Sequence, residues 1–143
     1  MYKRILIPVD GSPTGQKALE HGLALGKEQG AKVILTYVVE QLQVWATEGQ
    51  IDLGEVMREG GTAILADAEA KAKKAGVAAE KLLVEAGVQR TARSIVDQAA
   101  KLNADLIVMG THGRRGIDHL IMGSVAEGVV RTAPVPVLLI RGT

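Results

Sequence analysis

The sequence contains no cysteine among its 143 residues. Disulfide bonds, thiolate nucleophiles and cysteine metal ligands are therefore excluded, and this composition is typical of a reducing compartment such as the cytoplasm. Aromatic side chains are almost as scarce, because the chain has only Tyr2, Tyr37 and Trp45. Three aromatic rings are too few to build a platform on which nucleic-acid bases stack.

An excess of charge of one sign is also lacking. The chain has 17 Lys and Arg against 16 Asp and Glu, a net charge of +1, which gives no reason to expect a nucleic-acid or membrane partner. The apolar runs are far shorter than the roughly 20 residues that a membrane-spanning helix needs, and the first of them stops at Asp10, too early for a signal-peptide core. We expect a cytoplasmic protein with a single domain over residues 1–143.

Five short apolar runs alternate with segments of helical pattern. The runs are rich in β-branched residues and leucine and are apolar on both faces, which is typical of parallel strands covered by helices on both sides. The expected strands are Ile5–Val9, Val33–Val39, Lys81–Glu85, Leu106–Met109 and Val135–Ile140. The expected helices are Pro13–Gln29, Leu53–Lys74, Thr91–Leu102 and Ser124–Thr132. The sequence therefore predicts an α/β fold with a doubly wound, five-stranded parallel sheet.

The ends of the first helix are marked clearly. Ser12 is the expected N-cap, Pro13 occupies the first helical position, and Gly30 follows the last one. In the second helical pattern, by contrast, the pair Gly60-Gly61 predicts a kink or a break.

The segment from Glu40 to Asp52 fits neither pattern. It carries Trp45 and the turn-prone sequence Glu48-Gly49-Gln50. It also follows the carboxyl end of the second expected strand, and such folds bind ligands at the carboxyl ends of their strands. A lid over the ligand and a variable surface loop are equally consistent with this segment.

The most informative motif lies between the fourth expected strand and the fourth expected helix. The sequence Gly110-Thr111-His112-Gly113 follows the strand, and Gly123-Ser124 opens the helix after nine intervening residues. Glycines let a backbone approach a ligand closely, and the N–H groups of a helix N-terminus attract phosphate. Because Arg114 and Arg115 add positive charge to the same loop, we interpret the loop as a phosphate site rather than as a merely glycine-rich turn.

Two other strand ends add to this interpretation. Asp10 follows the first strand, where its carboxylate is suited to accept hydrogen bonds from a ribose or a base, or to hold a cation through water. A turn-forming aspartate before Gly11 is the alternative. Val38, near the end of the second strand, offers backbone groups to a base. His112 faces either phosphate or solvent, and because no carboxylate pair accompanies it or His119, we expect no zinc or iron centre.

Signatures of catalysis are missing from the sequence. It has no GxxxxGK[ST] P-loop, no early GxGxxG, no G-x-S-x-G elbow and no Cys–His pair. No residue is evident that would activate water or orient a second substrate, so we expect nucleotide binding without an enzymatic reaction. The alternatives are a slow ATPase or phosphotransferase using the same pocket, an interaction scaffold with a vestigial pocket, and, more distantly, a flavin- or nicotinamide-binding sheet.

Taken together, the chain resembles the universal stress protein family, which has the Rossmann-like fold of the adenine-nucleotide α-hydrolase-like superfamily. The resemblance covers essentially the whole chain and rests on the segments Lys3–Ser12, Ala104–Gly113, Gly123–Val125 and Pro134–Ile140. The ATP-binding branch of that family is marked by the pattern G-x2-G-x9-G-[S/T], which this chain matches with Gly110, Gly113, Gly123 and Ser124.

The resemblance implies an ATP site made by three strand ends and one helix. Its adenine and ribose side would consist of Pro8, Val9, Asp10, the backbone of Val38, Met109 and Gly110. Its triphosphate side would consist of Gly113, Arg114, Gly123, Ser124 and Val125, with His112 in the same loop. Mg²⁺ or Mn²⁺ would be held mainly by the phosphate oxygens, and no catalytic residue is assigned.

The resemblance also implies the strand order 3-2-1-4-5 and a homodimer. Val135–Ile140 would be an edge strand that pairs antiparallel with its copy. An apolar edge strand left unpaired is an aggregation hazard, which favours the dimer independently. The implied role is a stress-response or signalling module whose nucleotide occupancy changes the surface shown to a protein partner.

Overall fold

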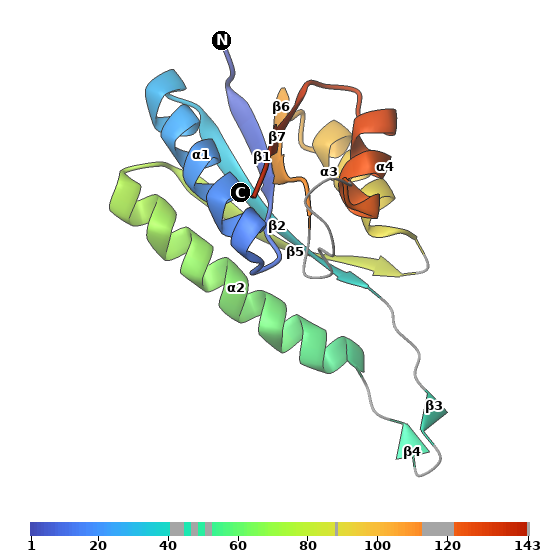
Figure 1. The fold of residues 1–143 in the computed structure, drawn as a ribbon. Coiled ribbons are helices and arrows are strands. Elements are labelled where there is room, and N and C mark those ends of the chain that lie inside the picture. Colours follow the sequence, from blue (N-terminus) through green and yellow to red (C-terminus); the bar gives the residue numbers. More distant parts are fainter. Residues whose placement is uncertain (41–44, 47–48, 51–52, 88, 113–121, 143) are drawn as a thin grey trace.

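The computed structural model describes residues 1–40, 45–46, 49–50, 53–87, 89–112 and 122–142. The elements, in chain order, are β1 (Arg4–Pro8), α1 (Pro13–Gln29), β2 (Lys32–Glu40), β3 (Trp45–Ala46), β4 (Gly49–Gln50), α2 (Leu53–Ala75), β5 (Ala79–Gly87), α3 (Thr91–Lys101), β6 (Leu106–Gly110), α4 (Ser124–Thr132) and β7 (Val137–Ile140) (Figure 1). All nine helices and strands expected from the sequence are present, with ends that differ by at most two residues.

The main sheet has the strand order β5-β2-β1-β6-β7, and every neighbouring pair is parallel. Numbered along the chain, this is the predicted order 3-2-1-4-5. The chain builds outward from β1 through β2 to β5, then returns to the other side of β1 and adds β6 and β7. The winding therefore reverses between β1 and β6, and folds of this kind bind ligands beyond the carboxyl ends of those two strands.

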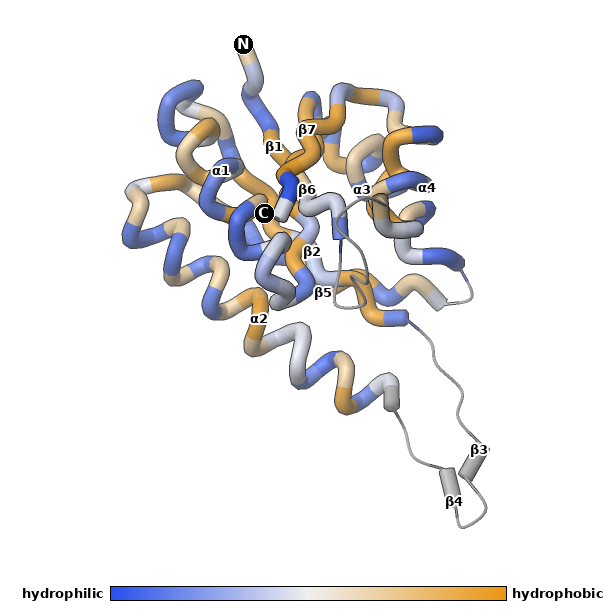
Figure 2. Tube along the Cα trace, in the orientation of Figure 1, coloured by the Kyte–Doolittle hydropathy of each residue, from blue (hydrophilic) through white to orange (hydrophobic). Residues whose placement is uncertain are grey.

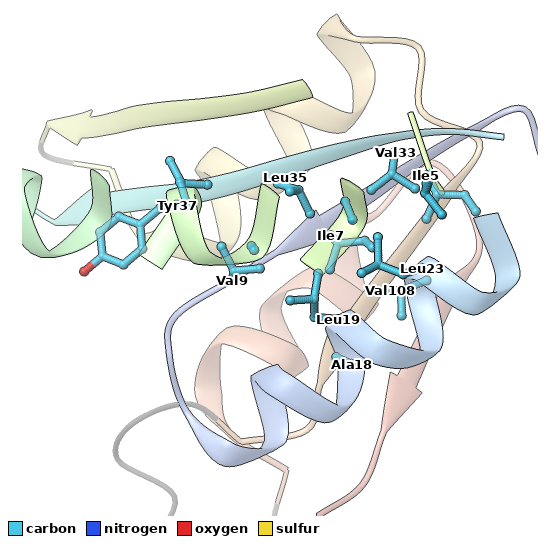
Figure 3. Close-up of a cluster of buried hydrophobic side chains, with 14 of the residues drawn as sticks. Ile5, Ile7, Val9, Ala18, Leu19, Leu23, Val33, Leu35, Tyr37 and Val108 are labelled. Atoms are coloured by element: carbon cyan, nitrogen blue, oxygen red, sulfur yellow. The ribbon is translucent and has the colours of Figure 1, made fainter. Parts of the chain in front are cut away.

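Helices cover both faces of the sheet, which explains why the strands are apolar on both sides. Helices α1 and α2 pack on one face, where Ile5, Ile7, Val33 and Leu35 are buried (Figure 3). Helices α3 and α4 pack on the other, over residues that alternate with these, such as Leu6. Figure 2 shows hydrophobic residues concentrated along the strands, while hydrophilic ones recur along the outer side of α2.

Helix α1 packs on the sheet through glycines that face the strands. A Cβ atom at Gly22 would lie 2.3 Å from Cδ1 of Ile7, and one at Gly26 would lie 2.8 Å from Cγ2 of Val33. Both distances are far inside van der Waals contact, so no larger residue fits without movement. This packing holds the middle and the C-terminal part of α1 against β1 and β2.

The expected kink or break at Gly60-Gly61 is wrong, because α2 runs as one continuous helix. Gly61 is instead a packing residue: a Cβ atom there would lie 2.4 Å from Cδ1 of Tyr37 and 3.0 Å from Cδ1 of Leu83. The missing side chain lets α2 sit over the groove between β2 and β5.

The segment after β2 contains a small separate sheet. Strands β3 and β4 pair antiparallel, with Trp45 opposite Gln50 and Ala46 opposite Gly49. The remaining residues of 41–52 lie outside the described part of the chain, so the choice between a lid and a variable loop stays a prediction. Within the described ranges, no helix is long and apolar enough to cross a membrane.

The last strand is shorter than expected, since β7 begins at Val137 rather than at Val135. Pro134 and Pro136 have no N–H to donate to a ladder, which delays regular pairing. The carbonyl of Pro136 nevertheless accepts a hydrogen bond of 3.0 Å from the N–H of Ile107, so β6 already holds the chain there.

Candidate functional site

Asp10 orders the turn that follows β1. Its Oδ1 atom accepts hydrogen bonds from the backbone N–H of Ser12, at 2.9 Å, and from the Ser12 hydroxyl, at 2.6 Å. Ser12 Oγ accepts in turn from the N–H of Gly15 at 3.0 Å, which confirms Ser12 as the N-cap of α1. The turn-forming interpretation of Asp10 is therefore correct for one carboxylate oxygen, and the half-buried side chain stands at the carboxyl edge of the sheet.

Gly15, which is not among the residues expected at the site, allows this close approach. A Cβ atom at Gly15 would lie 2.5 Å from Oδ1 of Asp10 and 3.0 Å from Oγ of Ser12. The first turn of α1 and the Asp10 carboxylate thus occupy adjacent positions only because residue 15 has no side chain. The sequence signal for this role of Gly15 is a glycine three residues after an N-cap serine.

The first glycine of the loop motif packs against the same helix end. A Cβ atom at Gly110 would lie 3.0 Å from Cβ of Thr14 and 3.1 Å from its carbonyl carbon. From the C-terminal side, a Cβ atom at Gly142 would lie 3.0 Å from Cγ2 of Thr14. The carboxyl ends of β6 and β7 therefore converge on the N-terminus of α1, and Gly110 has a packing role whatever the loop binds.

The loop motif closes at the N-terminus of α4. Gly123 is the N-cap, with extended backbone angles (φ −63°, ψ 155°) and no side-chain cap. Its N–H donates to the carbonyl of Thr111 at 2.7 Å, and its carbonyl accepts from the N–H of Glu127 at 2.9 Å. Thr111 also donates its own N–H to the carbonyl of Ile140 at 3.0 Å. The backbone of Thr111, a residue not expected at the site from the sequence, thus joins the start of α4 to the end of β7.

The first turn of α4 has backbone donors that no described residue accepts from. Among the described residues, the N–H groups of Ser124, Val125 and Ala126 have no hydrogen-bond partner. Such groups are the unsatisfied donors of a helix N-terminus, where the helix dipole also favours negative charge. The N–H of Gly123 is already used, so the donors begin one residue later than the glycine.

Of the expected base-side positions, Val38 and Met109 belong to the core cluster on the α3/α4 face of the sheet, whereas Val9 belongs to the cluster on the α1/α2 face. Val38 and Val125 are partly buried and pack against the core cluster that includes Met109. Pro8 ends β1, and the buried Val9 continues the pairing with β2, since its N–H donates to the carbonyl of Thr36 at 2.8 Å. The structure therefore brings together strand ends that are up to about a hundred residues apart in the sequence.

The rest of the predicted set is described only in part. His112 is half-buried, and its Nδ1 atom lies 2.9 Å from Oγ1 of Thr111. Gly113 and Arg114 fall within 113–121, outside the described residues, and their roles stay predictions. In the part of the chain that the structure describes, no group of three or more His, Asp or Glu side chains is arranged to hold a metal ion.

The sequence profile of the universal stress protein family matches residues 1–141 of this chain. The chain belongs to the universal stress protein family. The resemblance drawn from the sequence motifs is thereby confirmed over nearly the whole length.

Individual members of the family agree with this assignment. A universal stress protein of Methanocaldococcus jannaschii is 38% identical over 144 residues, which cover 99% of this chain and 83% of the relative. The crystal structure of a universal stress protein from Burkholderia pseudomallei is 36% identical and superposes with a TM-score of 0.82, covering 99% of this chain and 97% of that one. A universal stress protein solved in complex with cAMP is 25% identical, with a TM-score of 0.75 and 99% coverage of both chains.

Proposed function

We propose that this protein is an ATP-binding universal stress protein, a homodimeric module of the cytoplasm whose nucleotide occupancy signals stress to a protein partner. One observation carries the proposal: α4 begins with the backbone donors of Ser124, Val125 and Ala126 at the point where the sheet reverses its winding. A helix N-terminus in this place is suited to bind phosphate.

The nucleotide would lie beyond the carboxyl ends of β1 and β6 with its phosphates at α4. Gly123 would keep the approach to those donors clear, and Gly113 and Arg114 would reach the phosphates from the loop. Mg²⁺ or Mn²⁺ would bridge phosphate oxygens, because both are hard cations that prefer oxygen ligands. The metal would add only neutralising charge to the polyphosphate.

The base and ribose would occupy the other half of this site. Val38 and Met109 provide apolar surface for a base on the α3/α4 face, while Pro8, Val9 and Asp10 border it from β1 and Gly110 and His112 from β6. A family member 25% identical to this chain was solved with cAMP, which supports an adenine nucleotide as the ligand. The match to the glycine motif favours ATP among such nucleotides.

We propose binding rather than turnover. Oδ1 of Asp10 accepts two hydrogen bonds within the Ser12 turn, and Nδ1 of His112 lies beside Thr111. We assign neither residue a catalytic role. Slow ATP hydrolysis or phosphoryl transfer in the same pocket is the alternative, and an assay for ADP and phosphate release decides between them.

The homodimer would form through β7, which lies at the edge of the sheet. Leu138 is 39% exposed on that strand, and Val130 is 46% exposed on α4. Pairing of two β7 strands across a two-fold axis would satisfy the edge and cover apolar surface.

Thermal unfolding with nucleotide tests the proposal. At a hundredfold excess of MgATP over its dissociation constant, linkage stabilises the folded state by about 2.7 kcal/mol. For a chain of this length we expect the melting temperature to rise by about 5–10 °C. MgGTP at the same concentration is the control and should give a smaller shift. Protein shown to be free of bound ligand that gains no stability from any adenine nucleotide would contradict the proposal.

A further inference from the structure

The opposite edge of the sheet is formed by β5, a strand of nine residues that pairs only with β2 among the described residues. The carbonyl of Ala78 accepts a hydrogen bond from Val33 across this pair. Because bonding alternates along a parallel strand, the backbone groups of Lys81, Leu83 and Glu85 point outward. Long strands with open backbone groups pair readily with another chain unless they are guarded.

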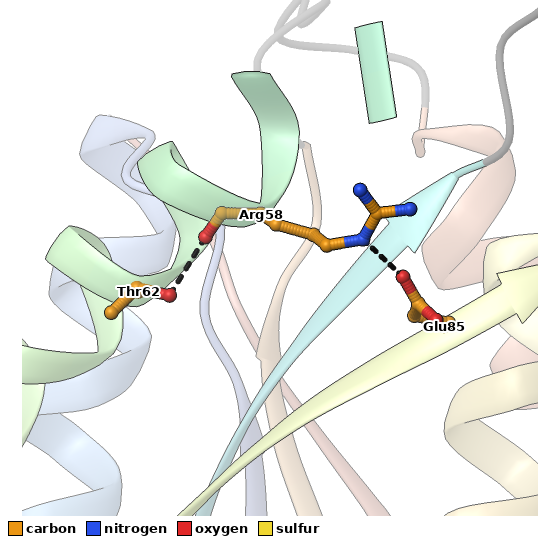
Figure 4. A network of polar contacts seen from close by, with 3 residues as sticks. All are labelled: Arg58, Thr62 and Glu85. Atoms are coloured by element: carbon orange, nitrogen blue, oxygen red, sulfur yellow. Dashed lines mark hydrogen bonds and ion pairs between the residues drawn. The ribbon is translucent and has the colours of Figure 1, made fainter. Parts of the chain in front are cut away.

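Helix α2 runs beside this edge, and its side chains reach β5 on both sides of Leu83. Arg58 pairs with Glu85, as Figure 4 shows, and Nζ of Lys81 lies 3.3 Å from Oε1 of Glu69. Leu83 itself is 38% exposed between these two ion pairs. The edge therefore presents a central apolar side chain flanked by charges of alternating sign.

This pattern is complementary to itself. If two β5 strands pair antiparallel about a two-fold axis through Leu83, Lys81 of each copy lies opposite Glu85 of the other, because both are two residues from the centre. Each such contact joins the two ion pairs into a row of four side chains across the interface. Arg58 and Glu85 of one copy are followed by Lys81 and Glu69 of the second copy. Charges of opposite sign alternate along the whole row.

The helices fit the same arrangement. A Cβ atom at Gly61 would meet both Tyr37 and Leu83, so α2 lies over the groove between β2 and β5. With strands about 4.8 Å apart, the two α2 axes would be about 10 Å apart on one face of the joined sheet, a usual distance for packed helices.

The exposed flank of α2 that faces outward over β5 is also self-complementary. The same two-fold axis places Arg58 opposite Glu69 and Glu55 opposite Lys73, with the small residues Thr62 and Ala66 between them. Opposite charges at the ends and small side chains in the middle allow two such helices to approach closely.

We propose that the β5 edge and this flank of α2 form a second self-association surface, which binds another copy of the chain. Charges that guard an edge against pairing repel a second copy. Here the alternation brings opposite signs together instead, which favours one register of one partner. This surface lies at the opposite edge of the sheet from β7. Its formation requires neither nucleotide binding nor the β7 dimer.

Cross-linking tests the register directly, since the natural chain has no cysteine. Leu83→Cys places one thiol on the two-fold axis, where opposed Cβ atoms are about 5 Å apart. Val56→Cys, at a position 59% exposed on α2, is the control. Its two thiols would be separated by about 22 Å along the paired helices. With a short bifunctional maleimide we expect Leu83→Cys to form covalent dimers on the order of tenfold faster. Equal rates would overturn the proposal.

An exchange of charges separates pairing between copies from packing within one copy. In the Leu83→Cys background, Lys81→Glu alone and Glu85→Lys alone should each cross-link slowly, because like charges then meet across the axis. A mixture of the two proteins restores opposite charges at both contacts, so the fast rate should return as a dimer of unlike chains. If the mixture is as slow as its components, the charges act only within each copy and the proposal fails.

A measurement without any change at β5 completes the test. Val137→Pro blocks the outer side of β7, and sedimentation velocity of that protein then reports on the β5 edge alone. We expect dimers at concentrations of about a hundred micromolar that dissociate as salt is raised. A monomer at every concentration would overturn the proposal, while the thermal response to MgATP still tests the nucleotide site separately.

Discussion

At the scale of single residues, Gly60 and Gly61 show that adjacent glycines have different roles. Gly61 is buried against Tyr37, whereas a Cβ atom at Gly60 would meet nothing within 4 Å. From the sequence alone the pair indicates a kink or a break in a helix, because the sequence does not give the distance from the helix to the strand beneath it. The contact that makes Gly61 necessary is between segments more than twenty residues apart.

This difference predicts opposite effects of one substitution at neighbouring positions. Gly61→Ala forces a methyl group into the Tyr37 ring and should lower the free energy of unfolding by about 1–3 kcal/mol. Gly60→Ala adds a helix-favouring residue at an open position and should raise it by about 0.5–1 kcal/mol. Urea unfolding of both variants is the measurement, and equal effects would mean that α2 is not held through Gly61.

Asp10 allows a second test at this scale, because its carboxylate has a structural partner and a proposed ligand. Asp10→Ala removes the acceptor for both Ser12 hydrogen bonds and should cost about 1–2 kcal/mol of unfolding free energy as well as nucleotide affinity. Asp10→Asn keeps an oxygen acceptor and should change stability by less than about 0.5 kcal/mol while still weakening MgATP binding. Calorimetric titration measures the affinity. If Asp10→Asn binds MgATP as the natural chain does, Asp10 is a turn residue only.

At the scale of elements, the sequence predicts those whose causes are local. The caps of α1 are Ser12 and Gly30, as expected, because N-cap and left-handed C-cap geometry depend on a few adjacent residues. The sequence underestimates the length of β5, which extends two residues further at each end than expected. An exposed edge strand carries charges such as Glu80 and Glu85, so its apolar run is short. The glycine motif marks the start of α4 correctly, but the bridge through Thr111 depends on tertiary contacts that no motif contains.

The N-terminus of α4 predicts how the proposed phosphate site is lost. The backbone angles of Gly123 are allowed for any residue, so Gly123→Val should leave the fold and its melting temperature nearly unchanged. Its branched side chain would stand in front of the N–H groups of Ser124 and Val125, and we expect the affinity for MgATP to fall at least about tenfold. Adenosine, which has no phosphate, is the matched ligand and should lose much less. An equal loss for both ligands would place the phosphates elsewhere.

At the scale of the whole molecule, the main sheet has two edges, β5 and β7, and each is proposed to pair with a second copy. On β7, hydrogen bonds from Ile107 to Pro136 and from Thr111 to Ile140 join the even-numbered residues to β6. The backbone groups of Val137 and Leu139 therefore point outward, toward any partner strand. Strand β7 has only four residues, so its open edge is short. A second copy would pair with the outward N–H groups of Val137 and Leu139.

This alternation predicts different outcomes for proline at adjacent positions. Val137→Pro removes an outward donor only, so it should give a folded monomer, since proline is tolerated at the open side of an edge strand. Leu138→Pro removes a donor that faces β6, so it should also lower the free energy of unfolding by about 3 kcal/mol or more. Light scattering at micromolar concentration measures the mass, and urea unfolding measures the stability. If the natural chain is already monomeric under these conditions, β7 does not form the dimer; if Val137→Pro stays dimeric, the copies meet through another surface, for which the β5 edge is the first candidate.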